Sequence, residues 1–163
     1  MINQILQAIW YILPSYVANV VPALVKKINI LNYPVDFGGN FKNKRIFGPH
    51  KTFRGLFLGI LFSGITSIIQ LRGFRVGLII GTGTLFGDLV GSFVKRRMGF
   101  EAGKKNLFID EVPGSFFGIS FAYIFGVLTL DIYQVLFLLI LGIPLHILAN
   151  KLWYRLKLKE VPW

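Results

Sequence analysis

Five apolar stretches, each close to the length that crosses a lipid bilayer, dominate this sequence. A helix needs about 20 mostly apolar residues to cross a hydrocarbon core of roughly 30 Å. The stretches are residues 2–25, 55–71, 74–94, 115–130 and 132–150. Hydrophobic residues make up 54% of the chain, whereas soluble domains have roughly 45–50% apolar residues. The sequence therefore predicts an all-α integral membrane protein, with about five transmembrane helices in a single membrane domain.

The basic residues lie on one side of these stretches. Of the 18 Lys and Arg residues, all but Arg72 and Arg75 fall in segments 26–54 and 95–114 or after residue 150. Basic residues concentrate in cytoplasmic loops. We therefore expect the N-terminus outside, the C-terminus in the cytoplasm, and two functional cytoplasmic loops at 26–54 and 95–114. The protein would be multi-pass in the cell membrane, and its basic charge would not serve nucleic-acid binding.

An acidic residue, Asp88, lies inside the third stretch. A carboxylate in a membrane span is costly and usually marks a functional site. Polar residues share its helix face at 100° per residue, namely Thr84, Ser92 and Lys95. Glycines recur every four residues and favour close helix packing, namely Gly83, Gly87 and Gly91. Asp88 could pair with Lys95 or Arg96, or it could face a ligand in a polar cleft beside the glycines.

A second acid, Asp110, lies where the second basic loop returns to the membrane. Its carboxylate could complement the dipole at the start of a helix, or it could act together with Asp88. Two carboxylates from adjacent helices in basic surroundings suit Mg²⁺ that bridges phosphates. We therefore predict that Asp88 and Asp110 bind one or two Mg²⁺ ions.

The first loop combines turn-forming and basic residues. Gly38 and Gly39 expose backbone N–H groups that can hold anions. Side chains that could bind phosphate follow them, namely Lys42, Lys44, Lys51, Thr52 and Arg54. The same loop could instead contact anionic lipid headgroups. Asp36 could fix the loop or contact a ribose or cytosine, and we assign no catalytic role to His50 or His146.

Together, the two acids and the two basic loops indicate a cleft for a polyphosphate and a divalent cation. Such a cleft at a membrane surface fits an enzyme that joins a nucleotide to a membrane lipid.

The motifs also resemble those of a known family. Asp88-Leu-Val-Gly-Ser92-Phe-Val-Lys95-Arg96, followed by Lys104 and Asp110, resembles the signature of membrane cytidylyltransferases that make CDP-activated lipids. His50-Lys51-Thr52-Phe53-Arg54-Gly55 is similar to their upstream Lys-Thr-x-x-Gly element. With the segment 34–39 and a short five-span chain, the pattern looks most like that of the CDP-archaeol synthases, over roughly residues 32–118. It departs from the bacterial CDP-diacylglycerol synthases in the longer gap before Lys104 and in Pro113-Gly114-Ser115.

This resemblance implies a reaction and a set of residue roles. CMP would pass from CTP to a phosphorylated isoprenoid glycerol diether, 2,3-bis-O-geranylgeranylglycerol 1-phosphate, giving CDP-archaeol and pyrophosphate. Asp88 and Asp110 would hold Mg²⁺, and Ser92 would support the metal or a phosphate. Phosphates would be gripped by Lys95, Arg96 and Lys104. CTP would be enclosed by the first loop, through Asp36, Gly38, Gly39, Lys42, Lys44, Lys51, Thr52 and Arg54.

Two other functions remain open on the sequence alone. A CDP-diacylglycerol synthase would use diacyl phosphatidate as the lipid. A small ion or proton transporter would need a polar path to the outer face, and the outer halves of the stretches are almost wholly apolar. The expected partners are CTP, the isoprenoid lipid phosphate and the bilayer, with a homodimer as a further option.

Overall fold

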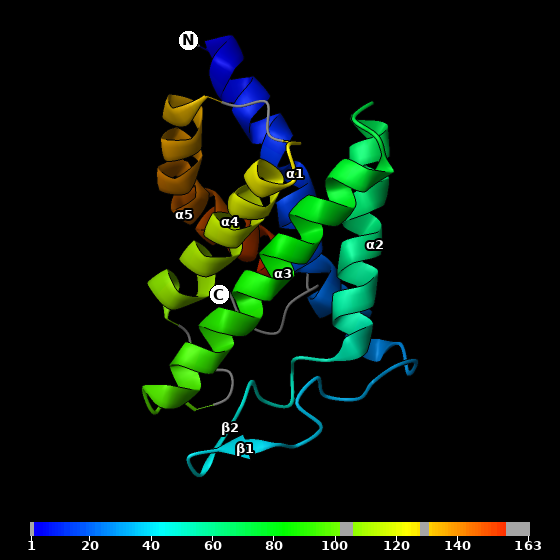
Figure 1. Cartoon of the computed structure of the whole chain (residues 1–163), viewed down its shortest axis with the longest axis vertical. Helices are drawn as coiled ribbons and strands as arrows, with labels where there is room; N and C mark the ends of the chain where they lie inside the picture. The colour runs from blue at the N-terminus through cyan, green and yellow to red at the C-terminus, as the bar shows by residue number, and fades with distance from the viewer. Residues whose placement is uncertain (1, 102–105, 128–130, 156–163) are drawn as a thin grey trace.

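The computed structural model describes residues 2–101, 106–127 and 131–155. Within these residues the fold is mostly helical, as the sequence predicts. The five α-helices are α1 (Ile2–Leu24), α2 (Phe53–Ile69), α3 (Phe74–Arg97), α4 (Leu107–Ile124) and α5 (Ile132–Arg155). A 3-10 turn, η1 (Val25–Lys27), follows α1, and two short strands, β1 (Asn40–Phe41) and β2 (Lys44–Arg45), lie in the first loop. The strands lie at one end of the helical bundle (Figure 1).

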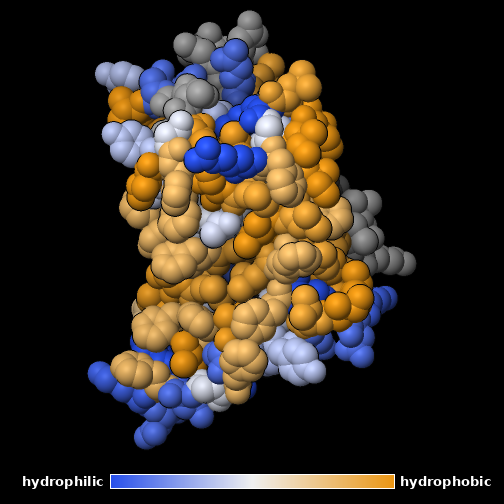
Figure 2. All heavy atoms as spheres, turned by 45° about the vertical axis from the view of Figure 1, so that its right-hand side comes forward, coloured by the Kyte–Doolittle hydropathy of each residue, from blue (hydrophilic) through white to orange (hydrophobic). Residues whose placement is uncertain are grey.

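The outer surface of the bundle is apolar over much of its height. Figure 2 shows a broad hydrophobic band, with hydrophilic residues gathered towards the two ends. In the described part of the chain, segments Ile9–Lys27 and Phe74–Arg97 are long and apolar enough to cross a membrane, while α2 and Val112–Ile124 are apolar but shorter. Large exposed apolar surface is rare on soluble monomers. This surface suits contact with lipid.

Glycines allow α3 to pack closely between α2 and α4. A Cβ added at Gly81 would lie 2.7 Å from Ser63 Cβ of α2, and one added at Gly83 would lie 2.5 Å from the Phe117 carbonyl oxygen of α4. Gly87 and Gly91 likewise meet the backbone of α4. The close packing that the four-residue glycine spacing predicts is therefore present, and it holds α4 against the polar face of α3.

The fourth helix begins earlier and ends earlier than the expected stretch 115–130. Asn106 caps its first turn, because its Oδ1 accepts a hydrogen bond from Ile109 N at 3.2 Å. Pro113 lies within α4 and has no N–H to donate to the Ile109 carbonyl. That carbonyl faces Gly91 of α3. The proline thus fits inside the helix, although the expected stretch began only after it, at residue 115.

The second helix also begins earlier than expected, at Phe53 instead of residue 55. Thr52 caps it, with its Oγ1 accepting from Gly55 N at 3.3 Å. An isolated bridge pairs Pro34 with Thr52, and Val35 N donates to the Lys51 carbonyl at 2.7 Å. The start of α2 therefore anchors the first loop and fixes the backbone of Lys51.

Candidate active site

The two basic loops meet at one end of the bundle, where α3 ends and α4 begins. The first loop and the β1–β2 hairpin lie beside the last turns of α3 in Figure 1. The hairpin pairs Asn40 with Arg45 and Phe41 with Lys44, and its two turn residues both have positive φ angles. Such a two-residue turn matches the twist of paired strands. The loop is thus a built structure at the end of α3.

Asp88 is paired with a lysine from the first loop. Lys51 Nζ lies 2.5 Å from Asp88 Oδ2, and the two side chains are 27% and 26% exposed. The sequence suggested Lys95 or Arg96 as the partner, but the structure places Lys51 there. A helix face and a loop far apart in the sequence therefore share one ion pair within reach of solvent.

Asp110 forms the second ion pair of the site. Lys95 Nζ lies 2.7 Å from its Oδ1 and 3.1 Å from its Oδ2. Asp110 also accepts from Asn106 N at 2.9 Å, in the first turn of α4. The structure therefore supports the helix-start reading of this acid and adds a cation from α3 as its partner, while its joint action with Asp88 stays a prediction.

The two ion pairs lie along one face of α3. Seven residues separate Asp88 from Lys95, which corresponds to a rise of about 10 Å along the helix. Ser92 lies between them and is buried, and Thr84 continues the face toward the bundle centre. Thr84 Oγ1 shares a 2.8 Å hydrogen bond with Ser15 Oγ of α1. The polar stripe that the sequence predicts is present, and two acids with two lysines line its loop-facing end.

Asp36 holds the first loop together. Its side chain is 0% exposed, and it accepts hydrogen bonds from the backbone N–H groups of Gly38, Phe47 and Gly48 at 3.0–3.1 Å. Arg45 Nη2 lies 2.7 Å from its Oδ1. Burial alone would raise the pKa of Asp36, but Arg45 and the three N–H donors outweigh it and hold the pKa well below its usual range. Of the two roles considered for Asp36, the structure supports fixing the loop.

Arginines at the end of α3 dock the hairpin. Arg97 donates to the carbonyls of Phe41, Lys44 and Arg45. Arg96 Nε donates to the Phe47 carbonyl at 3.3 Å. Sequence reasoning gave Arg97 no role, because nothing in the run Lys-Arg-Arg distinguishes a phosphate ligand from a side chain that binds backbone carbonyls.

Of the other first-loop residues predicted to bind CTP, the two hairpin lysines are exposed, whereas Arg54 and Gly39 bind backbone carbonyls. Lys42 and Lys44 are exposed on the hairpin, and Lys44 Nζ donates to the Arg97 carbonyl at 3.4 Å. Arg54 is only 5% exposed and donates to the Ile28 carbonyl, so it ties the start of α2 to the chain that follows η1. The N–H of Gly39 donates to the Asp36 carbonyl at 2.6 Å. Lys104 lies outside the described residues.

The oxygen donors at this site suit a metal that is shared with a substrate. Among the described residues, no three His, Cys, Asp or Glu side chains cluster closely enough to form a metal site of their own. Mg²⁺ commonly binds one or two carboxylates together with substrate phosphates and water. Asp88 on α3 and Asp110 in the first turn of α4, each partly exposed, are carboxylates of the kind that such a shared metal would use.

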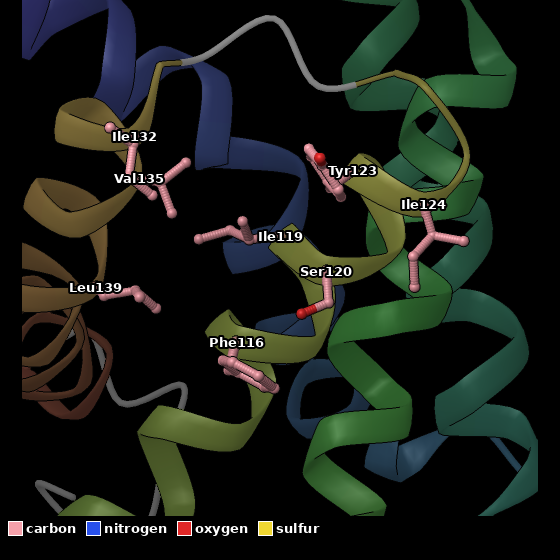
Figure 3. Close-up of a pocket in the computed structure, with 8 residues that line it drawn as sticks. All are labelled: Phe116, Ile119, Ser120, Tyr123, Ile124, Ile132, Val135 and Leu139. Carbon is pink, nitrogen blue, oxygen red and sulfur yellow. The ribbon is translucent and has the colours of Figure 1, made fainter.

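Two cavities adjoin these elements. A groove of about 620 Å³ runs between α4 and α5 (Figure 3). Apart from Ser120 and the hydroxyl of Tyr123 it is apolar, and it is lined by Phe116, Ile119, Ser120, Tyr123, Ile124, Ile132, Val135 and Leu139. A second cavity of about 270 Å³, called the hairpin pocket below, lies between the first loop and the end of α3.

Comparison with known proteins gives consistent matches over the whole chain. A family model described as CarS-like CDP-archaeol synthase matches residues 1–74 and 71–163. A CDP-archaeol synthase of Pyrococcus abyssi is 37% identical, over 99% of each chain. That of Methanococcus maripaludis is 36% identical, over 96% of this chain and 95% of the relative.

A solved structure also superimposes on most of the fold. It is that of an intramembrane enzyme for the biosynthesis of archaeal membrane lipids, with a TM-score of 0.75 and 28% sequence identity. The match covers 89% of this chain and 93% of that one. Together with the apolar helices, this similarity indicates that the chain associates with a membrane.

Proposed function

The chain belongs to the CDP-archaeol synthase family, and from this premise we propose that it forms CDP-archaeol by transferring CMP from CTP to a phosphorylated isoprenoid glycerol diether. The observation that carries the proposal is the pair of Lys–Asp contacts, one joining the first loop to α3 and the other joining α3 to the first turn of α4. They gather two acids and two cations at the end of a membrane bundle. That is the arrangement needed to hold a triphosphate against a lipid phosphate.

The reaction requires charge control more than nucleophile activation. The second pKa of a phosphate monoester is near 6, so the lipid phosphate is largely a dianion at neutral pH. One of its oxygens attacks the α-phosphorus of CTP. A new phosphoanhydride bond forms, the bond from the α-phosphorus to the bridging oxygen breaks, and pyrophosphate leaves. No side chain has to remove a proton, so the protein must mainly bring two anions together and stabilise the leaving group.

Residues at the end of α3 carry these tasks. In the free protein the ammonium groups of Lys51 and Lys95 form ion pairs with Asp88 and Asp110. The phosphates of a bound substrate can accept hydrogen bonds from the same ammonium groups. Asp88 and Asp110 would hold Mg²⁺, with Ser92 beside them. When bound, Mg²⁺ supplies positive charge that neutralises the phosphates and the departing pyrophosphate. Lys104 remains a predicted phosphate ligand.

The groove between α4 and α5 suits an isoprenoid chain of the lipid. Asp110 lies in the first turn of α4, and the groove begins at Phe116 on the same helix and ends at Ile124 (Figure 3). These positions lie about 9 and 21 Å along the helix from Asp110. A lipid phosphate held near Asp110 can therefore extend a long chain into the groove.

A bulky substitution in the groove tests this assignment. Ser120→Phe should slow the reaction with the geranylgeranyl lipid at least tenfold, but it should affect a short-chain analogue much less. Ile65→Phe on the exposed face of α2 is the matched control. Equal slowing of both lipids in Ser120→Phe would argue against a chain in this groove.

The membrane arrangement follows from the same elements. Five spans, with the N-terminus outside and the C-terminus in the cytoplasm, would place the first loop and the α3–α4 connection together on the cytoplasmic face of the cell membrane, where CTP is available. The N-terminus and the first loop lie at opposite ends of the bundle (Figure 1), which supports their placement on opposite sides of the membrane. A homodimer stays a prediction.

The direct test of the reaction is pyrophosphate release by the purified protein in liposomes. We expect release only when CTP, Mg²⁺ and a lipid phosphate are all present, with less release from diacyl phosphatidate than from the isoprenoid ether lipid phosphate. Omission of each component is the control. Folded protein that releases no pyrophosphate with either lipid would contradict the proposal.

A further inference from the structure

The hairpin pocket lies beside the ion pairs and is walled by two segments. The first loop contributes Lys44, Gly48 and Pro49, and the end of α3 contributes Arg96, Phe100 and Glu101. Its volume of about 270 Å³ is below the roughly 300–1,000 Å³ of sites for drug-sized ligands. The pocket therefore suits one heterocyclic base with part of its sugar, and it is too small for a whole nucleoside triphosphate.

The helix terminus places Phe100 and Glu101 at the pocket. Phe100 N donates to the Lys95 carbonyl at 3.0 Å, and Gly99 N donates to the Arg96 carbonyl at 3.3 Å. This pair of bonds is a Schellman ending, which turns the chain back across the helix. Gly99 has a φ of 83°, a conformation that favours glycine. The segment Met98-Gly99-Phe100-Glu101 thus brings Phe100 and Glu101 into the lining of the hairpin pocket.

Hydrogen bonds also fix the first-loop wall of the pocket and the Arg96 side chain that contacts it. The N–H of Gly48 is held by Asp36 Oδ2 at 3.0 Å, and the guanidinium of Arg96 is held by the carbonyls of Phe47 and Phe100. Lys51 N donates to the Gly48 carbonyl at 3.3 Å. The pocket and the Lys51–Asp88 pair therefore share one short turn of the first loop.

The charges of the pocket are mixed, which argues against a simple phosphate site. The positive charge of Arg45 is matched by Asp36, and Glu101 adds a carboxylate to the lining. Lys44 and Arg96 bring hydrogen-bond donors, Glu101 brings acceptors, and Phe100 brings an aromatic ring. A flat ring that has both a donor and acceptors along one edge would match these groups.

We propose that the hairpin pocket binds the cytosine base of the nucleotide and that Glu101 selects it over uracil. This inference rests on the proposed function. Cytosine presents an amino donor at its position 4, which carboxylates accept, whereas uracil presents a carbonyl acceptor at the same position. Lys44 or Arg96 donates to the remaining acceptors of cytosine, and Phe100 provides a surface for stacking. With the base in the pocket, the triphosphate points along the first loop toward Lys51 and Asp88.

The test compares CTP and UTP in Glu101→Gln and Glu101→Ala. Binding of each nucleotide to the purified protein is measured by calorimetry, and kcat/KM is measured by pyrophosphate release. Asp131→Asn, at an exposed acid before α5, is the control for removal of a negative charge. We expect the wild type and Asp131→Asn to prefer CTP. We expect that preference to fall about 10- to 100-fold in Glu101→Ala, mainly through weaker CTP binding. Glu101→Gln should strengthen UTP binding relative to the wild type, because the glutamine amide can rotate so that its NH₂ group donates to the carbonyl of uracil.

The outcomes separate this inference from the proposed function. An unchanged ratio of CTP to UTP binding in both Glu101 variants would overturn the base assignment, even if CDP-lipid forms at full rate. Parallel loss of CTP and UTP binding would also overturn it, because a residue that only supports the pocket weakens both. Absence of turnover with intact, selective CTP binding would instead count against the proposed reaction and leave the base pocket standing.

Discussion

Gly87 of α3 provides a test of how helix packing positions the site. A Cβ added there would lie 2.5 Å from the Pro113 carbonyl carbon and 2.9 Å from Gly114 Cα of α4. Both contacts are backbone, so no side chain can swing away to relieve them. The first turns of α4 would have to move by about 1 Å, and overpacking of this kind costs roughly 1–3 kcal/mol.

The same shift would move Asp110 relative to Lys95, because Asp110 lies one turn before Pro113 on α4. A displacement of about 1 Å can reduce a rate by about 100-fold. We therefore expect Gly87→Ala to lower the rate of CDP-lipid formation by about two orders of magnitude. We also expect its thermal unfolding midpoint in detergent to fall by a few degrees.

Gly142→Ala in α5 is the matched control. A Cβ added at Gly142 would lie 3.6 Å from Ser115 Oγ, an ordinary van der Waals contact. This variant should keep its rate within about threefold and its midpoint unchanged or slightly raised. The reasoning is wrong if Gly87→Ala behaves as the wild type, or if Gly142→Ala loses as much activity as Gly87→Ala.

Three further predictions address the site directly. Lys51→Ala should raise the KM for CTP roughly 10- to 100-fold, because a charge-assisted contact to the nucleotide is lost. The control Lys27→Ala, in η1, should leave the KM unchanged. An unaltered CTP saturation curve in Lys51→Ala would exclude Lys51 from the nucleotide site. Asp110→Asn should slow turnover at least about 100-fold with helicity retained by circular dichroism, and wild-type turnover would exclude Asp110 from the chemistry. The pKa of Asp36 is depressed from its ordinary value of 3.8, so its stabilisation of the loop is present above that pH and is lost as pH falls toward the lower, folded-state pKa. Amide exchange of residues 36–48, corrected for intrinsic rates, should rise in acid for the wild type and show no such step in Asp36→Asn.

The general architecture could be predicted because it follows from hydrophobicity and spacing. The apolar stretches gave the helices, and the four-residue spacing of Gly83, Gly87 and Gly91 gave the face against which α4 packs. The start of α4 was misplaced because Pro113 interrupts a helical pattern. Proline disfavours a helix interior only where the lost hydrogen bond and the ring are not accommodated, and here the glycine face of α3 accommodates them.

The partners within the site could not be predicted, because they depend on tertiary contacts. Lys51 and Asp88 are far apart in the sequence, and only the folded first loop brings them to 2.5 Å. Asp36 looked like a candidate ligand, yet its neighbours Arg45 and Gly48 satisfy it within the loop. An isolated motif shows which residues are charged, but whether a charge binds substrate or backbone depends on the loop geometry around it.

We expect the acids and lysines at the end of α3 to carry cytidylyl transfer to an isoprenoid lipid phosphate. The most direct measurement is mass-spectrometric quantification of CDP-lipid and pyrophosphate from CTP in liposomes, for the wild type and for Asp88→Asn at matched folded content. The account predicts equal amounts of the two products from the wild type and at least a 100-fold lower rate from Asp88→Asn. CDP-lipid formation at the wild-type rate by Asp88→Asn would contradict it.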